Sequence, residues 1–378
     1  MRAEEGDETV NDYAAEGKQT LGRIKDSQRG GSTLAGLSGG SPGSSGVSRI
    51  PQGATLPADA APDHLPRTPK IVSRPSGLRL RASYDLLVTT APEQFTTHGP
   101  GGVRIVADRL GDPQARAVVF LHGGGQTRRS WARAAAAVAR RGWQAVTIDL
   151  RGHGESDWSS EGDYRVVSFA ADVQEVLRNL PPRPVLVGAS LGGFTSMLLV
   201  GEVSPGIASA VVLVDIVPNM EQSGATRIHN FMADRVKSGF GSLEEVADAI
   251  AEYNPHRPRP TDLDGLTTNL RRRGDRWYWH WDPQFISGTA PFPPFEVTDA
   301  DRMHAAVDAI LRSGVPMLLI RGQMSDLVSQ ERAHEFLARF PQVEFTDVRG
   351  AGHMVAGDRN DIFAEAVLDF LARHVDAG

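Results

Sequence analysis

The chain has 378 residues, a net charge of −6 and 40% hydrophobic residues, which is typical of a globular protein with one large domain or two smaller ones. No basic excess favours a nucleic-acid partner, and no apolar run approaches the roughly 20 residues that span a bilayer. The absence of cysteine excludes disulfides and cysteine-bound metals. Since the acidic N-terminus is unlike a signal peptide, we expect a cytoplasmic protein. We expect a small-molecule substrate and neither a membrane nor a nucleic-acid partner. The oligomeric state stays open.

The first 80 residues have the composition of a disordered tail. Between Ser27 and Pro62 there is no aromatic residue and only five large apolar ones. Such a segment buries too little surface to offset its chain entropy. We therefore expect residues 1–80 to be disordered.

Apolar runs alternate with helical patterns through the rest of the chain. A hairpin is predicted over 94–97 and 103–106, around Gly99–Gly102. Continuous apolar runs predict buried strands, over 117–121, 144–150, 185–187, 210–215, 317–320 and 343–348. Helices are predicted between and after them, over 130–141, 166–180, 191–203 and 361–374. This alternation indicates an α/β fold with a mostly parallel, doubly wound sheet.

One connection is far longer than the others. Nearly a hundred residues separate Asp215 from Val315, whereas such loops usually have about 2–6. A capping box at Ser242–Glu245 begins a helix, and the segments 261–264 and 298–301 begin two more. We expect residues 218–298 to be a helical lid, inserted into a core made of residues 81–217 and 299–378.

Ser190 lies between an apolar run and a helical stretch, at the centre of Gly188-Ala-Ser-Leu-Gly192. A strand, a sharp turn and a helix with serine at the apex present a hydroxyl as a nucleophile. Two further Gly-x-Ser-x-Gly matches, at 36–40 and 39–43, lack a neighbouring strand and helix. Ser190 is therefore the candidate nucleophile.

A serine nucleophile needs a histidine base and a carboxylate that orients it. His353 and Asp326 each follow a predicted strand in a glycine-containing loop, and the order Ser190, Asp326, His353 is the one found in this kind of architecture. Asp215, just after another strand, is the alternative acid. Three other histidines, His122, His153 and His280, are alternative candidates for the base. We expect His122 to brace the oxyanion loop and His153 to brace the turn over 151–154.

The glycines after the first parallel strand, Gly123-Gly-Gly125, allow backbone N–H groups to approach a developing negative charge. We expect the oxyanion donors to be the N–H groups of Gly124 and Leu191.

Five motifs in order carry a resemblance to a known family. They are Leu121-His-Gly123, Asp149-Leu-Arg-Gly-His-Gly-Glu-Ser-Asp157, the Ser190 pentapeptide, Gly322-Gln-Met-Ser-Asp326 and Gly350-Ala-Gly-His353. From about Gln94 onward the chain resembles the α/β-hydrolase superfamily, in its lid-bearing serine hydrolase branch. The resemblance implies the α/β-hydrolase fold. Because the apex residue is Ser190 rather than the aspartate of epoxide hydrolases and dehalogenases, those two reactions are excluded. The loop over 322–326 is one residue longer than the commonest version of this motif in the family.

The segment Arg276–Trp281 holds three tryptophans, Trp277, Trp279 and Trp281. We expect them either to form an apolar ceiling over the substrate or to pack the lid onto the core. Arg128 and Arg129 could bind a substrate carboxylate, but we expect them to be a solvated helix start. No metal-ligand spacing or cofactor fingerprint is found, so neither a metal nor a cofactor is expected.

These features predict a hydrolase that cleaves a small or medium apolar ester or lactone through an acyl-enzyme on Ser190. The same groups could serve a C–C bond hydrolase or a perhydrolase. A receptor-like binding protein on the same fold is the alternative outside enzymes.

Overall fold

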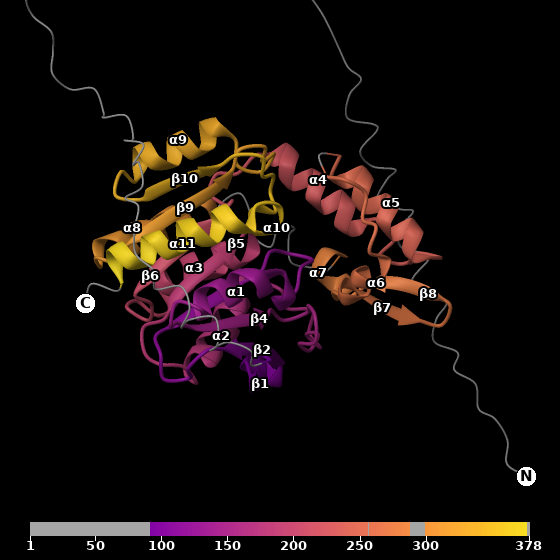
Figure 1. Cartoon of the computed structure of the whole chain (residues 1–378), viewed down its shortest axis with the longest axis horizontal. Coiled ribbons are helices and arrows are strands. Elements are labelled where there is room, and N and C mark those ends of the chain that lie inside the picture. The colour runs from indigo at the N-terminus through magenta and orange to yellow at the C-terminus, as the bar shows by residue number, and fades with distance from the viewer. Residues whose placement is uncertain (1–90, 256, 288–298, 376–378) are drawn as a thin grey trace, which may run out of the picture. The chain divides into compact units, whose positions relative to one another are not determined.

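The computed structural model describes residues 91–255, 257–287 and 299–375, which belong to one compact unit, Ser76–Gly378. The tail predicted over residues 1–80 lies outside these ranges. The predicted fold class is confirmed: an eight-stranded sheet has the order β1-β2-β4-β3-β5-β6-β9-β10 (Figure 1). The β1–β2 and β2–β4 pairs are antiparallel, and all other pairs are parallel.

The strands form where the apolar runs lie, and each ends within a few residues of its predicted limit. They are β1 (Glu93–His98), β2 (Arg104–Leu110), β3 (Ala117–Leu121), β4 (Gln144–Asp149), β5 (Val185–Ala189), β6 (Ala210–Val214), β9 (Met317–Gly322) and β10 (Glu344–Val348). The helices of the core are α1 (Ala132–Ala139), α2 (Val166–Leu177), α3 (Leu191–Leu198), α8 (Asp299–Arg312), α9 (Gln330–Arg339), α10 (Val355–Asp358) and α11 (Asn360–His374). Short helical turns complete it, η2 (Pro100–Gly102), η3 (Arg128–Trp131) and η4 (Leu199–Val203).

Helices cover both faces of the sheet because successive side chains of a strand point to opposite faces. In β3, Val118 and Phe120 join the core beneath α1 and α11, whereas Val119 and Leu121 join the core beneath α2 and α3. Both faces are therefore buried, which explains why these strands read as continuous apolar runs. Among the described residues, no helix has the length and apolar character needed to span a membrane.

The inserted segment, meaning the described part of residues 218–298, follows β6. It contains α4 (Gln222–Ala233), α5 (Leu243–Tyr253), α6 (Leu263–Leu266), η5 (Thr267–Asn269), β7 (Leu270–Arg273), β8 (Arg276–Trp279) and α7 (Pro283–Ser287). The predicted cap of α5 is present, since the Ser242 hydroxyl accepts the Glu245 N–H. The described part of the segment is mostly helical, but it also holds an element that was not expected, because β7 and β8 pair as an antiparallel hairpin (Figure 1).

The turn between β5 and α3 requires glycine on both sides of Ser190. A Cβ atom on Gly192 would lie 2.3 Å from the Leu121 carbonyl oxygen, and one on Gly188 would lie 2.3 Å from the Gly192 carbonyl oxygen. Both neighbours are backbone atoms and cannot rotate away. Gly192 therefore lets α3 pack directly against β3, and Gly188 lets the first turn of α3 pack against β5.

We predict that Gly192→Ala lowers the free energy of unfolding by roughly 1–3 kcal/mol, because the new methyl group overpacks a backbone contact. Gly241→Ala is the control, since a Cβ there meets only the carboxylate at the far end of the Glu245 side chain, at 3.2 Å. Urea unfolding of the two variants measures the difference. Equal stabilities would show that the turn has room for a side chain.

Candidate active site

The backbone at Ser190 is bent sharply. It has φ 46° and ψ −111°, a conformation that non-glycine residues rarely adopt, and it connects the end of β5 directly to the first turn of α3. The strand, turn and helix expected around Ser190 are thus present. Ser190 and His353 line the same cavity.

His353 is held by Asp215 rather than by Asp326. The Nδ1 atom of His353 lies 2.7 Å from Asp215 Oδ2. Because a carboxylate only accepts, this contact fixes the tautomer with the proton on Nδ1 and leaves Nε2 as the basic nitrogen. The histidine lies in the loop between β10 and α10, where the sequence predicted it.

The Asp215 carboxylate is fully buried and receives three hydrogen bonds. Besides His353, the Gly322 N–H donates to Oδ1 at 2.9 Å and the Ser325 hydroxyl donates to Oδ2 at 2.5 Å. Asp215 has φ 51° directly after β6, and aspartate tolerates this left-handed conformation better than most residues do. The three donors together fix the position of the Asp215 carboxylate behind the histidine.

The prediction that Asp326 orients His353 is therefore corrected. Asp326 forms an ion pair of 2.6 Å with Arg227 on α4, and 35% of its side chain is exposed. Its neighbour Ser325 takes the inward position and bonds to Asp215 instead. The sequence did contain the right residue, as the alternative acid that ends the β6 apolar run.

Gly124 and Leu191, the residues expected to supply the oxyanion donors, line the same cavity as Ser190. Gly123 N–H donates to Gln126 Oε1 at 3.1 Å, and Gly125 N–H donates to His153 Nε2 at 3.0 Å. Within the described ranges no acceptor is found for the Gly124 N–H. Leu191 is the first residue of α3, where an N–H has no partner inside the helix. Neither N–H group therefore has a hydrogen-bond acceptor among the described residues.

The cavity has a volume of about 330 Å³ and mostly apolar walls. Helix α4 and α5 supply apolar side chains, and β8 supplies Trp279, whose ring stacks on that of Trp281 at 4.8 Å. Trp279 and Trp281 line the cavity and also belong to the buried core. Trp277 does not line the cavity; it pairs with Phe240 and lies under the Arg272 guanidinium.

Three buried histidines lie beside the glycine loop and are held in neutral form. Burial, together with neighbouring imidazoles, lowers the pKa of His122, His153 and His280 to about 3 in each case. His122 Nε2 accepts the Leu150 N–H at 3.0 Å, and its Nδ1 lies 2.8 Å from the Gly123 carbonyl. The bracing roles expected for His122 and His153 agree with these contacts.

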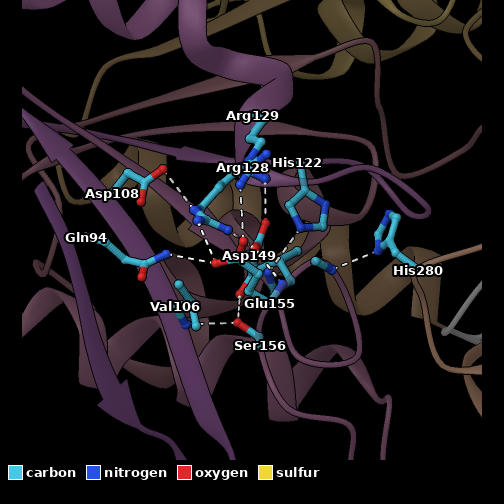
Figure 2. Close-up of polar contacts among 12 residues, drawn as sticks. Gln94, Val106, Asp108, His122, Arg128, Arg129, Asp149, Glu155, Ser156 and His280 are labelled. Carbon is cyan, nitrogen blue, oxygen red and sulfur yellow. Dashed lines mark hydrogen bonds and ion pairs between the residues drawn. The ribbon is translucent and has the colours of Figure 1, made fainter. Parts of the chain in front are cut away.

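Arg128 is buried, so the expectation of a solvated helix start was wrong for this residue. Its guanidinium pairs with Asp149, with Asp108 at 2.9 Å and with Glu155 at 3.0 Å, as Figure 2 shows. Only 3% of the side chain is exposed. Arg129 is exposed and pairs with Glu155 at 3.1 Å. The network joins β2 and β4 to the turn after β4, and this use of Arg128 excludes it from binding a substrate carboxylate.

The neutral histidines make the protein less stable in acid. Their pKa of about 3 in the folded protein lies below the ordinary value of 6.5, so the unfolded chain binds more protons. The contribution of the neutral histidines to the free energy of unfolding is complete above pH 6.5 and is lost as the pH falls from 6.5 toward 3. We therefore expect the free energy of unfolding, measured with urea at each pH, to fall over this range.

The variant His122→Gln removes one of the three titrating groups. Its free energy of unfolding should be lower at neutral pH and should fall less steeply as the pH is lowered. A wild-type stability that stays constant between pH 7 and pH 4 would contradict the neutral state of these histidines.

The comparisons with known proteins agree with this geometry. A family model for the alpha/beta hydrolase fold matches residues 116–359. The esterase Rv0045c of Mycobacterium tuberculosis is 29% identical in sequence, over 67% of this chain and 82% of its own length. A solved structure of that esterase covers 74% of this chain and 92% of its own chain, with a TM-score of 0.59. The sn-1-specific diacylglycerol lipase ABHD11 of Mus musculus is 30% identical, over 69% of this chain and 83% of its own. The 3-hydroxybutyrate-oligomer hydrolase of Cupriavidus necator is 27% identical, over 67% and 88%. The chain therefore belongs to the alpha/beta hydrolase family and is a hydrolase.

Proposed function

We propose that the protein hydrolyses a carboxylic ester through an acyl-enzyme on Ser190, with His353 as base and Asp215 as the orienting acid. The observation that carries the proposal is the contact between His353 Nδ1 and the buried Asp215 carboxylate, at the cavity that also holds Ser190. Asp326 has no part in this mechanism, since it is paired with Arg227 on the inserted segment.

The reaction has two halves. His353 Nε2 takes the Ser190 proton as the serine oxygen attacks the ester carbonyl, and the oxyanion is stabilised by the N–H groups of Gly124 and Leu191. The protonated histidine then gives its proton to the departing alcohol, and an acyl-serine ester remains. Water next loses a proton to His353 and attacks this ester, and Ser190 recovers its proton as the acid is released.

A small or medium apolar ester or lactone fits the site best. The cavity walls are mainly apolar, and α4, α5 and β8 supply much of them. The relatives include an esterase, a lipase and a hydrolase of hydroxybutyrate oligomers, which favours ester chemistry over C–C bond cleavage or perhydrolysis. We further propose that residues 218–298 act as the lid over this cavity, between core parts 81–217 and 299–378.

A fluorophosphonate probe tests the nucleophile. The wild-type protein should be labelled, because the probe reacts with an activated serine, and Ser190→Ala should abolish both labelling and hydrolysis of a p-nitrophenyl ester series. Ser196→Ala is the control, since this serine is buried within α3 and its hydroxyl donates to the Gly192 carbonyl at 2.8 Å. A folded wild type without labelling would favour the receptor-like binding protein.

A pair of matched variants tests the acid. Asp215→Asn should lower kcat by up to about 10⁴-fold, because the amide no longer fixes the Nδ1–H tautomer. Asp326→Asn should retain nearly full kcat, since it loses only a half-exposed ion pair with Arg227. Steady-state kinetics on one ester decides between them, and the reverse order of effects would restore Asp326 as the acid.

A further inference from the structure

Three consecutive peptide units of the oxyanion loop are each held by a buried histidine. The carbonyl of Gly123, which belongs to the same peptide unit as the Gly124 N–H, lies 2.8 Å from His122 Nδ1. The next peptide unit carries the Gly125 N–H, which donates to His153 Nε2 at 3.0 Å. The third carries the Gly125 carbonyl, which lies 3.2 Å from His280 Nε2.

The hydrogen bonds define one neutral tautomer for each ring. His153 accepts at Nε2 and donates from Nδ1 to the Arg151 carbonyl at 2.9 Å. His280 accepts the Gly154 N–H at Nδ1, 2.8 Å away, and so has its proton on Nε2, where it faces the Gly125 carbonyl. Each imidazole thus donates one hydrogen bond and accepts one, so the bonds fix both its tautomer and its ring orientation.

His280 differs from the other two in its origin. His122 and His153 follow β3 and β4 of the core, whereas His280 directly follows β8 of the inserted segment. Only 2% of its surface is exposed, and its ring centroid lies 5.9 Å from that of His153. Further bonds fix the same region to the core: Arg271 donates to the Gly154 carbonyl at 2.6 Å, and the Asp282 N–H donates to the Gly152 carbonyl at 2.9 Å.

The glycine loop needs such support. Gly125 has φ +76°, and glycine has more backbone freedom than any other residue. An oxyanion donor is effective only when its N–H already points to where the negative charge develops. The peptide unit that carries the Gly124 N–H is followed directly by the two Gly125 units, so rotation of those units would misdirect the Gly124 N–H.

We propose that His280, acting with His153, is a positioning residue of the oxyanion hole, so that the inserted segment contributes to the rate of reaction and not only to substrate access. This inference rests on the proposed function, because it requires the Gly124 N–H to stabilise an oxyanion. His280 itself touches neither the substrate nor Ser190 in the mechanism; it acts through the Gly125 peptide.

The test compares His280→Ala with His280→Gln, whose side-chain amide can still donate toward the Gly125 carbonyl. His304→Ala is the control, since His304 is also buried but lies on α8 and packs on Phe340. Rates are divided by the concentration of sites that the fluorophosphonate titrates, so that unfolded protein does not count.

We expect His280→Ala to lower kcat by at least about 10-fold, yet by less than the 100- to 1000-fold cost of removing a donor outright, with KM nearly unchanged. A boronic acid, whose adduct with serine places an oxygen in the oxyanion hole, should bind more weakly by a similar factor. His280→Gln should recover part of both losses, and His304→Ala should change neither.

Two failures are distinguishable. If the wild type is neither labelled nor active, the proposed function is wrong. If the wild type is active and His280→Ala keeps the wild-type kcat and boronic acid affinity, or loses them no more than His304→Ala does, the proposed function stands and the positioning role of His280 is overturned.

Discussion

The hydrogen bond between Asp215 and His353 joins two loops that are 138 residues apart in the chain. Burying a carboxylate is costly unless donors surround it, and here Gly322 and Ser325 complete the set. Ser325 in turn accepts the N–H groups of Leu327 and Val328, both at 3.1 Å. The loops after β6, β9 and β10 are thereby tied together at one edge of the sheet, and the position of the histidine depends on all three.

The inserted segment forms ion pairs with the regions that follow β9 and β10. On α4, Arg227 pairs with Asp326, next to Ser325. Arg257 pairs with Asp358, which also accepts the Gly352 N–H at 2.9 Å, directly before His353. Together with the contact of His280 at the glycine loop, these ion pairs connect the segment to three loops of the core. We therefore expect the docking of this segment and the order of those loops to be coupled.

The strands of the sheet and the turn at Ser190 could be predicted from the sequence, for physical reasons. Strands buried on both faces form continuous apolar runs, and Gly188 and Gly192 are required by backbone contacts that any side chain would break. The hairpin β7–β8 was missed because its strand residues Arg271–Arg273 are charged and show no apolar alternation. The burial of Arg128 was missed because its partners Asp108 and Asp149 come from other strands.

The choice between Asp215 and Asp326 shows what local pattern leaves undecided. Both follow strands that end at the same edge of the sheet, β6 and β9, so both satisfied the rule for the position of the acid. The structure separates them by their neighbours: a loop serine and a backbone N–H converge on Asp215, whereas an arginine from the inserted segment draws Asp326 outward. Those neighbours are set by tertiary packing, which spacing along the chain does not encode.

Proton NMR of the imidazole N–H groups tests the central claim most directly. A proton on His353 Nδ1 that is bonded to a buried carboxylate should give a low-field signal that exchanges slowly with water. We expect this signal, assigned by its loss in His353→Gln, to persist in Asp326→Asn and to shift or vanish in Asp215→Asn. A signal that is unaffected in Asp215→Asn but lost in Asp326→Asn would contradict the pairing on which the account depends.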